Sequence, residues 1–355
     1  MRGASGERAP EELDFRPDAV RRVRELIMAR GAAAQLCVLR YGEVLIDRSY
    51  GVPENAPFLL FSAGKPLVAM LVHQLAEQGM LSLDDPVARH WPEFEINGKG
   101  LITVRHVLQH RSGLPYVRSV WRDALNAPDW NRSVRALVGA RPHWAPGQVP
   151  AYHILSYGFL LGELIQRVTG RPLRDVLRDR LLEPLGLRDT HLGLSAGVPM
   201  RGAGHGGPRL LQTLANRRRV REALIPAATV SSTARDLATF YQALLDGRAL
   251  SAATVAGACE PSTDGEVDRV LGNRIRWAHG FQLGGDADGE PGRPRPMGRL
   301  SSRKAFGHNG SNACIGWSDP ERGLVVAYLT NRLEASPETA PYQCEMSDAI
   351  LTGCK

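Results

Sequence analysis

Two β-hairpin patterns, one near each end of the chain, constrain the fold more than any other feature of this sequence. Residues Gln35–Arg40 and Val44–Tyr50 alternate in polarity on either side of a Tyr-Gly-Glu turn. A second pair, Ala313–Ser318 and Leu324–Thr330, flanks the turn-rich stretch 319–323. Strands at both ends with helices between them predict a single antiparallel sheet that is built from the two chain termini and interrupted by a helical insertion.

Helical periodicity dominates the chain from about residue 66 to residue 245. The predicted helices cover Leu67–Gly79, Val104–His110, Ile154–Thr169, Leu173–Leu181 and Ala234–Leu245. Two more are expected near the termini, at Asp18–Arg30 and Pro337–Leu351. The stretch Gly284–Pro296 is rich in Gly, Pro and Asp, and we expect it to be an exposed loop.

Ser62 and Lys65 stand three residues apart where a predicted helix begins. At this spacing their side chains share one helix face. A serine hydroxyl needs a nearby base to become a nucleophile, and a lysine in low-dielectric surroundings can lose its proton and act as that base. The backbone N–H of Ser62 could also stabilise a developing oxyanion. The plainer interpretation is a helix-capping serine beside a surface lysine, because such spacing often arises by chance.

The basic composition makes Lys65 a stronger candidate for a functional residue. Of the 44 basic residues only four are lysine and the other 40 are arginine, with a net charge of +7. The arginines are scattered, only Arg217–Arg219 forms a cluster, and no nucleic-acid motif accompanies it. We therefore expect no nucleic-acid partner. Each lysine is a position at which this arginine-rich chain does not use arginine.

A second serine motif competes with the first. Residues 193–197 match G-x-S-x-G, the nucleophile elbow of α/β-hydrolases, with Ser195 as its serine. That motif requires a strand before it and a helix after it. Here the preceding residues Leu185–Leu192 resemble a loop, and Pro199 follows almost at once. The pattern favours a simple Gly/Ser turn.

Several further motifs follow Ser62 and Lys65 in a fixed order. They are Gly79–Val87, Trp91–Pro92, Ile102–Pro115, Trp144–Gly147, Ala151–Glu163 and Phe306–Gly310. Together they resemble the serine β-lactamase and penicillin-binding-protein superfamily, above all the class C β-lactamase-like family VIII carboxylesterases and related transacylases. The resemblance extends from about Gln35 to Arg332.

The resemblance implies roles for individual residues. Ser62 would be the acylated nucleophile and Lys65 its proton partner. Tyr152 stands at the tyrosine of the family's Y-x-N motif, as a second acid/base group, and either Lys65 or Tyr152 could be the general base. His308 occupies the third motif, on an edge strand beside the site. The backbone N–H groups of Ser62 and Ser311 would form the oxyanion hole.

The same motifs suggest substrate-binding residues and show two departures from the family. His153, Ile154, Asn309 and Gly310 are expected to contact substrate. Ile154 replaces the asparagine of Y-x-N, and its side chain can neither donate nor accept a hydrogen bond. His308 replaces the lysine of K-T-G, so a fixed positive charge is missing, although a histidine could shuttle a proton near neutral pH. These losses favour esters over penicillins.

The resemblance implies a fold of two parts with the site in a cleft between them. Residues 15–80 and 225–355 would form an α/β sandwich, an antiparallel sheet flanked by helices, and 81–224 a mostly helical domain. We expect tryptophans to line an apolar pocket, namely Trp121, Trp130, Trp144 and Trp317.

The predicted function is a serine acyl-transfer enzyme acting on a small-molecule ester, with hydrolysis and transfer both open. The expected partners are a small-molecule acyl donor and a water, alcohol or amine acceptor, without metal or organic cofactor. The alternatives are a β-lactamase or D,D-peptidase, and a non-catalytic ligand-binding protein. The charged N-terminus and the lack of a long apolar run predict a cytoplasmic protein without a membrane partner.

Overall fold

The computed structural model of the chain describes residues 6–194, 198, 209–287, 292–333 and 339–355. Ser195, the serine of the G-x-S-x-G pattern, lies outside these residues. So does the beginning of the expected last helix, at residues 337–338.

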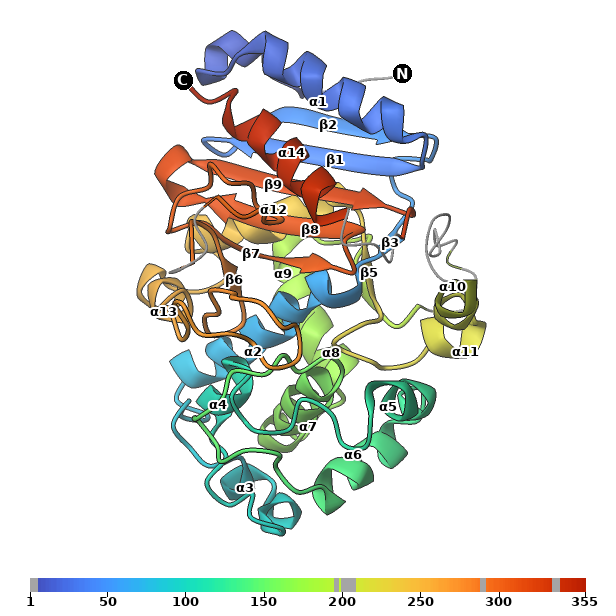
Figure 1. Ribbon diagram of the computed structural model, residues 1–355, viewed down its shortest axis with the longest axis vertical. Coiled ribbons are helices and arrows are strands. Elements are labelled where there is room, and N and C mark those ends of the chain that lie inside the picture. Colours follow the sequence, from blue (N-terminus) through green and yellow to red (C-terminus); the bar gives the residue numbers. More distant parts are fainter. Residues whose placement is uncertain (1–5, 195–197, 199–208, 288–291, 334–338) are drawn as a thin grey trace.

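A six-stranded antiparallel sheet forms the centre of one half of the molecule, in the order β2-β1-β9-β8-β7-β6 (Figure 1). Its strands are β1 Ala34–Arg40, β2 Glu43–Tyr50, β6 Gln282–Leu283, β7 Phe306–Gly310, β8 Cys314–Asp319 and β9 Leu324–Thr330. Both predicted hairpins are present, and β1 pairs with β9 along its whole length, from Ala34–Thr330 to Arg40–Leu324. This pairing joins the two ends of the chain into one sheet, which confirms the predicted fold class.

Helices cover both faces of this sheet. Because side chains alternate along a strand, β1 directs Leu36 and Val38 to one face and Cys37 and Leu39 to the other. The first face packs against α1 (Pro17–Arg30) and α14 (Thr339–Leu351), while the second packs against α12 (Ala234–Leu245) (Figure 1). All seven residues of β1 are buried because both faces are covered.

The predicted helices are present with shifted ends. They appear as α2 Lys65–Glu77, α4 Val104–Leu108, α7 Ser156–Thr169 and α8 Leu173–Leu177, the last continuing into a π-helical turn at Arg178–Leu182. Helix α7 begins two residues later than predicted. The reason is a tertiary contact, because the carbonyl of Ile154 accepts a hydrogen bond from Lys65 instead of a helical N–H.

Shorter elements complete the structure. They are α3 Val87–His90, α5 Val120–Asn126, α6 Trp130–Gly139, α9 Glu183–Leu185, α10 Arg209–Ala215, α11 Arg218–Arg221 and α13 Ala252–Ala258, with 3-10 turns at Pro10–Leu13, Phe61–Gly64, Pro92–Glu95 and Pro320–Arg322. A small second sheet, β3-β5-β4, comprises Phe58–Leu59, Val230–Ser232 and His191–Leu192. The strand at His191–Leu192 lies where the sequence predicts a loop.

One hydrophobic cluster runs from the inner face of the sheet through α2 to α7 and α8. The sheet half and the helical half therefore share a continuous core, and the division at residues 81 and 224 stays a prediction. Among the residues that the structure describes, none of the helices combines the length and the apolar character that crossing a bilayer requires.

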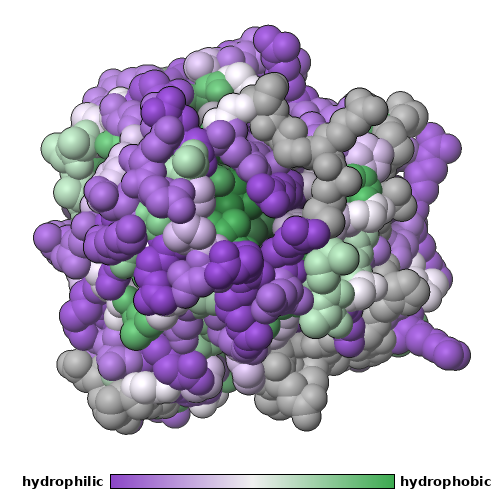
Figure 2. Space-filling model, turned by 90° about the horizontal axis from the view of Figure 1, so that it is seen from above, coloured by the Kyte–Doolittle hydropathy of each residue, from purple (hydrophilic) through white to green (hydrophobic). Residues whose placement is uncertain are grey.

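Many of the arginines lie at the surface of the protein. Hydrophilic residues cover most of the face seen from above, around a small apolar hollow (Figure 2). Many exposed arginines pair with nearby carboxylates, as Arg22 does with Glu345 and Arg16 with Asp18, each at 2.6 Å. Such exposed pairs contribute little to stability, because water and salt screen the attraction between their charges.

Gly316 on β8 tests the packing of α12 on the sheet. A Cβ at this position would lie 2.5 Å from the Tyr241 ring and 2.8 Å from Leu237. We expect Gly316→Ala to lower the free energy of unfolding by about 1–3 kcal/mol, as overpacked cores do. The measurement is a urea unfolding curve.

Gly257 in α13 is the matched control, because a Cβ there would meet nothing within 4 Å. Gly257→Ala is expected to stabilise the protein by about 0.5–1 kcal/mol, as alanine does inside an exposed helix. Equal unfolding midpoints for Gly316→Ala and the wild type would contradict the packing argument.

Candidate active site

Ser62 lies in a tight 3-10 turn between β3 and α2. Phe61, just before it, has a left-handed backbone with φ +50°, which is uncommon for a bulky residue. Gly64 lies against Val230, whose Cβ would be 2.6 Å from a Cβ at this glycine. The turn is thus held between α2 and the small sheet, and it leaves Ser62 at the wall of a cavity.

The amine of Lys65 is buried at the centre of the site. Its Nζ lies 3.0 Å from Ser62 Oγ, 2.9 Å from Tyr152 Oη, 2.9 Å from the Ile154 carbonyl oxygen and 3.4 Å from that of Ala227. Among the described residues, no carboxylate forms an ion pair with it. Burial therefore lowers the pKa of Lys65 well below its ordinary value.

These contacts fix how a neutral amine would be oriented. The two carbonyl oxygens can only accept hydrogen bonds, so the N–H groups of Lys65 point towards them. The lone pair is then directed towards a hydroxyl, and the two hydroxyls within reach belong to Ser62 and Tyr152. The arrangement can take a proton from the serine.

Tyr152 is held in an aromatic enclosure. Its ring stacks on Trp277 with centroids 5.2 Å apart and an interplanar angle of 3°, and His110 packs edge-on at 4.9 Å. Burial raises the pKa of Tyr152, and the Ser62 hydroxyl offsets only part of this effect. The phenol therefore keeps its proton at neutral pH.

Asp268 is a residue of the site that the sequence analysis missed. Its buried carboxylate accepts hydrogen bonds from the backbone N–H of Tyr152 at 3.2 Å and from Trp277 Nε1 at 3.0 Å. It also accepts from the backbone N–H groups of Val270 and Leu271, both at 2.9 Å. One carboxylate thus fixes both partners of the Tyr152–Trp277 stack. No motif marks it, because it lies 116 residues from Tyr152.

Strand β7 passes directly beside the turn that carries Ser62. A Cβ on Gly310 would lie 1.9 Å from the Leu60 carbonyl oxygen, so only glycine allows this approach. The next residue, Ser311, has φ +46° and lines the same cavity as Ser62. Strand β7 pairs with the edge strand β6 only at Phe306 and Gly307. The third motif, His308–Gly310, lies beyond the end of this pairing.

Three of the expected site residues lie away from the cavity wall, and their roles stay predictions. His308 is buried, and burial lowers its pKa to about 3, so its ring is neutral near neutral pH. His153 points into the core, where its ring contacts Ser112 Oγ at 2.5 Å and the Ala151 carbonyl at 2.6 Å. Gly310 packs closely against Leu60.

A cavity of about 610 Å³ opens beside the serine. Ser62, Tyr152, Ile154, Asn309 and Ser311 line it. The four tryptophans do not. Trp121 is exposed, Trp317 belongs to the core on the other face of the sheet, Trp130 donates to Glu163, and Trp144 is absent from the wall.

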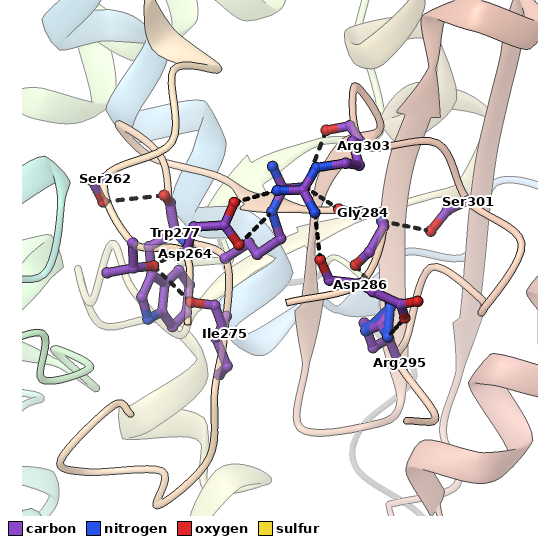
Figure 3. A network of polar contacts seen from close by, with 12 residues as sticks. Ser262, Asp264, Ile275, Trp277, Gly284, Asp286, Arg295, Ser301 and Arg303 are labelled. Atoms are coloured by element: carbon purple, nitrogen blue, oxygen red, sulfur yellow. Dashed lines mark hydrogen bonds and ion pairs between the residues drawn. The ribbon is translucent and has the colours of Figure 1, made fainter. Parts of the chain in front are cut away.

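Two loops that the sequence analysis did not assign to the site form the opposite wall. The first covers residues 271–276, and the second lies within the expected exposed loop, at residues 284–287 and 293–297. Figure 3 shows the polar network behind them, in which Asp264 and Asp286 lie on either side of the Arg303 guanidinium. Among the described residues no group of three or more His, Cys, Asp or Glu side chains could hold a metal ion.

The antiparallel sheet with flanking helices, and the serine and lysine before and at the start of α2, define the β-lactamase/transpeptidase-like class of proteins. The chain belongs to the Beta-lactamase family, whose profile matches residues 20–343. The esterase/beta-lactamase LipL of Mycobacterium tuberculosis is 31% identical over 331 residues, which cover 81% of this chain and 72% of LipL.

Solved structures agree in fold. A penicillin-binding-protein homolog from Caulobacter crescentus is 27% identical with a TM-score of 0.79, covering 96% of this chain and 98% of its own. A family VIII carboxylesterase is 25% identical with a TM-score of 0.78, covering 94% and 98%. Family and relatives together support a serine hydrolase or acyl-transfer activity in broad terms.

Asp268→Asn tests the support of Tyr152. We expect this substitution to slow the labelling of Ser62 by a fluorophosphonate about 10- to 100-fold. The loss of a buried hydrogen-bond acceptor costs about 1–3 kcal/mol, and Tyr152 would then be held less firmly beside Ser62. Labelling is followed by intact-protein mass spectrometry.

Asp319→Asn is the matched control. Asp319 is also fully buried and also accepts backbone N–H groups, from Ser302 and Glu321, but it lies in the β8–β9 hairpin. If both variants label at the wild-type rate, Asp268 does not position the site.

Proposed function

We propose that the protein is a serine esterase that forms an acyl-enzyme on Ser62. One observation carries the proposal. The buried Lys65 amine lies 3.0 Å from the Ser62 hydroxyl, and among the described residues no carboxylate pairs with it to keep it protonated. A neutral amine in this position is the base that a serine nucleophile requires.

Acylation would proceed in two steps. Lys65 Nζ takes the hydroxyl proton while Ser62 Oγ forms a bond to the ester carbonyl carbon. The carbonyls of Ile154 and Ala227 stabilise the resulting ammonium. The N–H groups of Ser62 and Ser311, both at the cavity wall, would stabilise the tetrahedral oxyanion.

Collapse of this intermediate breaks the bond to the leaving alcohol. Tyr152 is protonated and lies 2.9 Å from Lys65, so it can donate its proton to the leaving oxygen and regain one from the lysine ammonium. In deacylation a water molecule donates a proton to Lys65 and adds its oxygen to the acyl carbon. The bond between the acyl carbon and Ser62 Oγ then breaks, which releases the carboxylic acid, and Lys65 returns the proton to Ser62 Oγ. Here Lys65 is the general base and Tyr152 the proton relay.

The substitutions at the cavity support esters over β-lactams. Ile154 lines the cavity where its side chain offers no hydrogen bond, and His308 is buried and neutral, so neither replaces the missing polar anchors. An ester substrate does not require these anchors, because its carbonyl group needs only the oxyanion hole. β-lactamase or D,D-peptidase activity and simple ligand binding are the competing outcomes of the test.

Mass spectrometry with p-nitrophenyl butyrate tests the proposal. We expect a butyryl adduct, stable or transient, together with p-nitrophenol release, and loss of both in Ser62→Ala. The absence of adduct and turnover on any ester would overturn the proposal, as would nitrocefin turnover equal to ester turnover. Added alcohols or amines that yield butyryl products would identify transfer as the fate of the acyl-enzyme.

The pH profile tests the role of Lys65. Because its pKa is lowered, we expect kcat/KM to rise with pH through that pKa and to stay high above it, as the neutral amine is the active form. Lys65→Arg should lose about 100- to 10,000-fold in kcat/KM, since a guanidinium does not deprotonate.

Lys99→Arg is the matched control. Lys99 is also a buried lysine, and its Nζ donates to the carbonyls of Ile96, Val138 and Ala140 at 2.6–2.8 Å, away from the cavity. This variant should retain the wild-type pH profile, with folding checked by circular dichroism. Wild-type activity in Lys65→Arg would refute the lysine mechanism.

A further inference from the structure

Three side-chain amides form a row along the cavity wall next to Ser311. They belong to Gln282 on β6, Asn309 on β7 and Asn312, and all three residues line the cavity. The Gln282 amide contacts the Asn309 amide at 3.1 Å, and the Asn309 amide contacts that of Asn312 at 3.1 Å. We name these three residues the amide row. None of the three side chains carries a charge, so the row acts on a ligand through hydrogen bonding alone.

A backbone N–H group fixes the direction of every hydrogen bond in the amide row. The main-chain N–H of Asn309 can only donate, so the Gln282 atom that it contacts at 3.3 Å is the carbonyl oxygen Oε1. Gln282 Nε2 then donates to Asn309 Oδ1, and Asn309 Nδ2 donates to Asn312 Oδ1. The last amide nitrogen, Asn312 Nδ2, has no acceptor among the described residues. The row therefore leaves an N–H donor at the cavity wall.

A tight turn holds Asn312 directly after Ser311, whose N–H belongs to the proposed oxyanion hole. The two residues connect β7 to β8 with φ values of +46° and +53°, and the N–H of Ala313 donates to the Gly310 carbonyl at 2.9 Å. Asparagine tolerates this left-handed backbone, but glycine adopts it with less strain. The turn alone thus does not require an asparagine, whereas a directed amide at the cavity wall does.

The position of Tyr152 indicates which part of the substrate Asn312 would reach. Tyr152 would protonate the leaving alcohol, and its ring lies beside that of His308, with 6.1 Å between the centroids. Strand β7 runs from this end towards the turn that contains Ser311 and Asn312. The alcohol would therefore lie towards His308, and the acyl group would lie towards Asn312.

We propose that the acyl group of the substrate carries a second, neutral carbonyl oxygen, and that the Asn312 amide binds this oxygen while Ser62 attacks the ester. A plain alkyl chain in its place would displace water from the donor and leave it without an acceptor, so the site discriminates against such a chain. Asn312 is then a specificity-determining residue, and Gln282 and Asn309 are positioning residues that orient its amide. The inference rests on the proposed esterase function and names its substrate class, the oxoacyl esters.

A matched pair of esters tests the proposal. The esters p-nitrophenyl 4-oxopentanoate and p-nitrophenyl pentanoate share the leaving group and the chain length and differ in one ketone oxygen. Each kcat/KM is divided by the rate constant for hydrolysis of that ester by hydroxide, which removes the difference in intrinsic reactivity. We expect the corrected value to be at least about fivefold higher for the oxo ester, the effect of one hydrogen bond. Because neither ester is charged, 0.5 M NaCl should leave this ratio unchanged.

Variants of the amide row connect this preference to Asn312. Asn312→Gly keeps the left-handed turn and removes the donor, so the ratio should fall to about one. Gln282→Glu tests the direction of the row, because a carboxylate cannot donate to Asn309 Oδ1. The amides of Asn309 and Asn312 would then turn over, which places an acceptor at the cavity in place of the donor. This variant should therefore lose the oxo preference as well.

Asn97→Gly is the matched control. Asn97 also has a left-handed backbone, with φ +62°, but it is exposed and donates to the Gly139 carbonyl at 3.0 Å, away from the cavity. This variant should retain the wild-type ratio. General damage to the site lowers kcat/KM for both esters alike and does not change the ratio. A wild-type ratio near one, or a wild-type ratio retained in Asn312→Gly or Gln282→Glu, would overturn the proposal.

A binding measurement separates this proposal from the esterase function. NMR titration of the Ser62→Ala protein with methyl 4-oxopentanoate and methyl pentanoate needs no turnover. We expect the oxo ester to bind at least about fivefold more tightly, and Ser62→Ala/Asn312→Gly to lose the difference. Turnover by the wild type without an oxo preference would overturn only the amide-row proposal. An oxo preference in binding without turnover of any ester would overturn only the esterase proposal, and absence of both would overturn both.

Discussion

The burial of the Lys65 amine among uncharged oxygen atoms is the interaction on which the rest of the site depends. An ammonium ion is costly to remove from water, and no carboxylate in the described part of the chain pairs with this one, so the neutral form is favoured. The amine is surrounded by three separate segments that provide Ser62, the Tyr152–Ile154 stretch and Ala227. The continuous core of sheet and helices is therefore a condition for the chemistry, because it brings these segments together.

Close backbone approach is the second constraint. Gly310 lies against the backbone of Leu60, and Gly64 lies against the side chain of Val230, so strand β7 and the small sheet approach the nucleophile turn where a Cβ on either glycine would clash. This contact places Ser311 and Ser62 at one cavity wall. The left-handed backbone of Phe61 and Ser311 stores strain at the same place, and the surrounding packing has to maintain it.

A shell of neutral aromatic rings and a polar loop network then complete the site. His110, Trp277 and His308 surround Tyr152 and keep the region apolar, which sustains the shifted pKa values of Lys65 and Tyr152. Asp268 fixes the loop that carries Trp277, and the carboxylates of Asp264 and Asp286 pair with Arg276 and Arg295 on the two loops that border the cavity. Three carboxylates, of which only Asp268 is fully buried, therefore hold the loops that border the site.

The sequence by itself determined the two hairpins, most of the helices and the spacing of Ser62 and Lys65, because these follow from local periodicity, turn residues and neighbouring positions on one helix. The motif order also indicated Tyr152 and Ser311, which line the cavity with Ser62. Only the tertiary structure decided which way His153 and His308 point, that residues 284–287 and 293–297 border the cavity, and that Asp268 supports Tyr152. These outcomes depend on contacts between segments that are distant in the sequence, 41 residues for Ser112 and His153 and 116 residues for Tyr152 and Asp268. In such contacts burial, not the neighbouring sequence, sets orientation and charge.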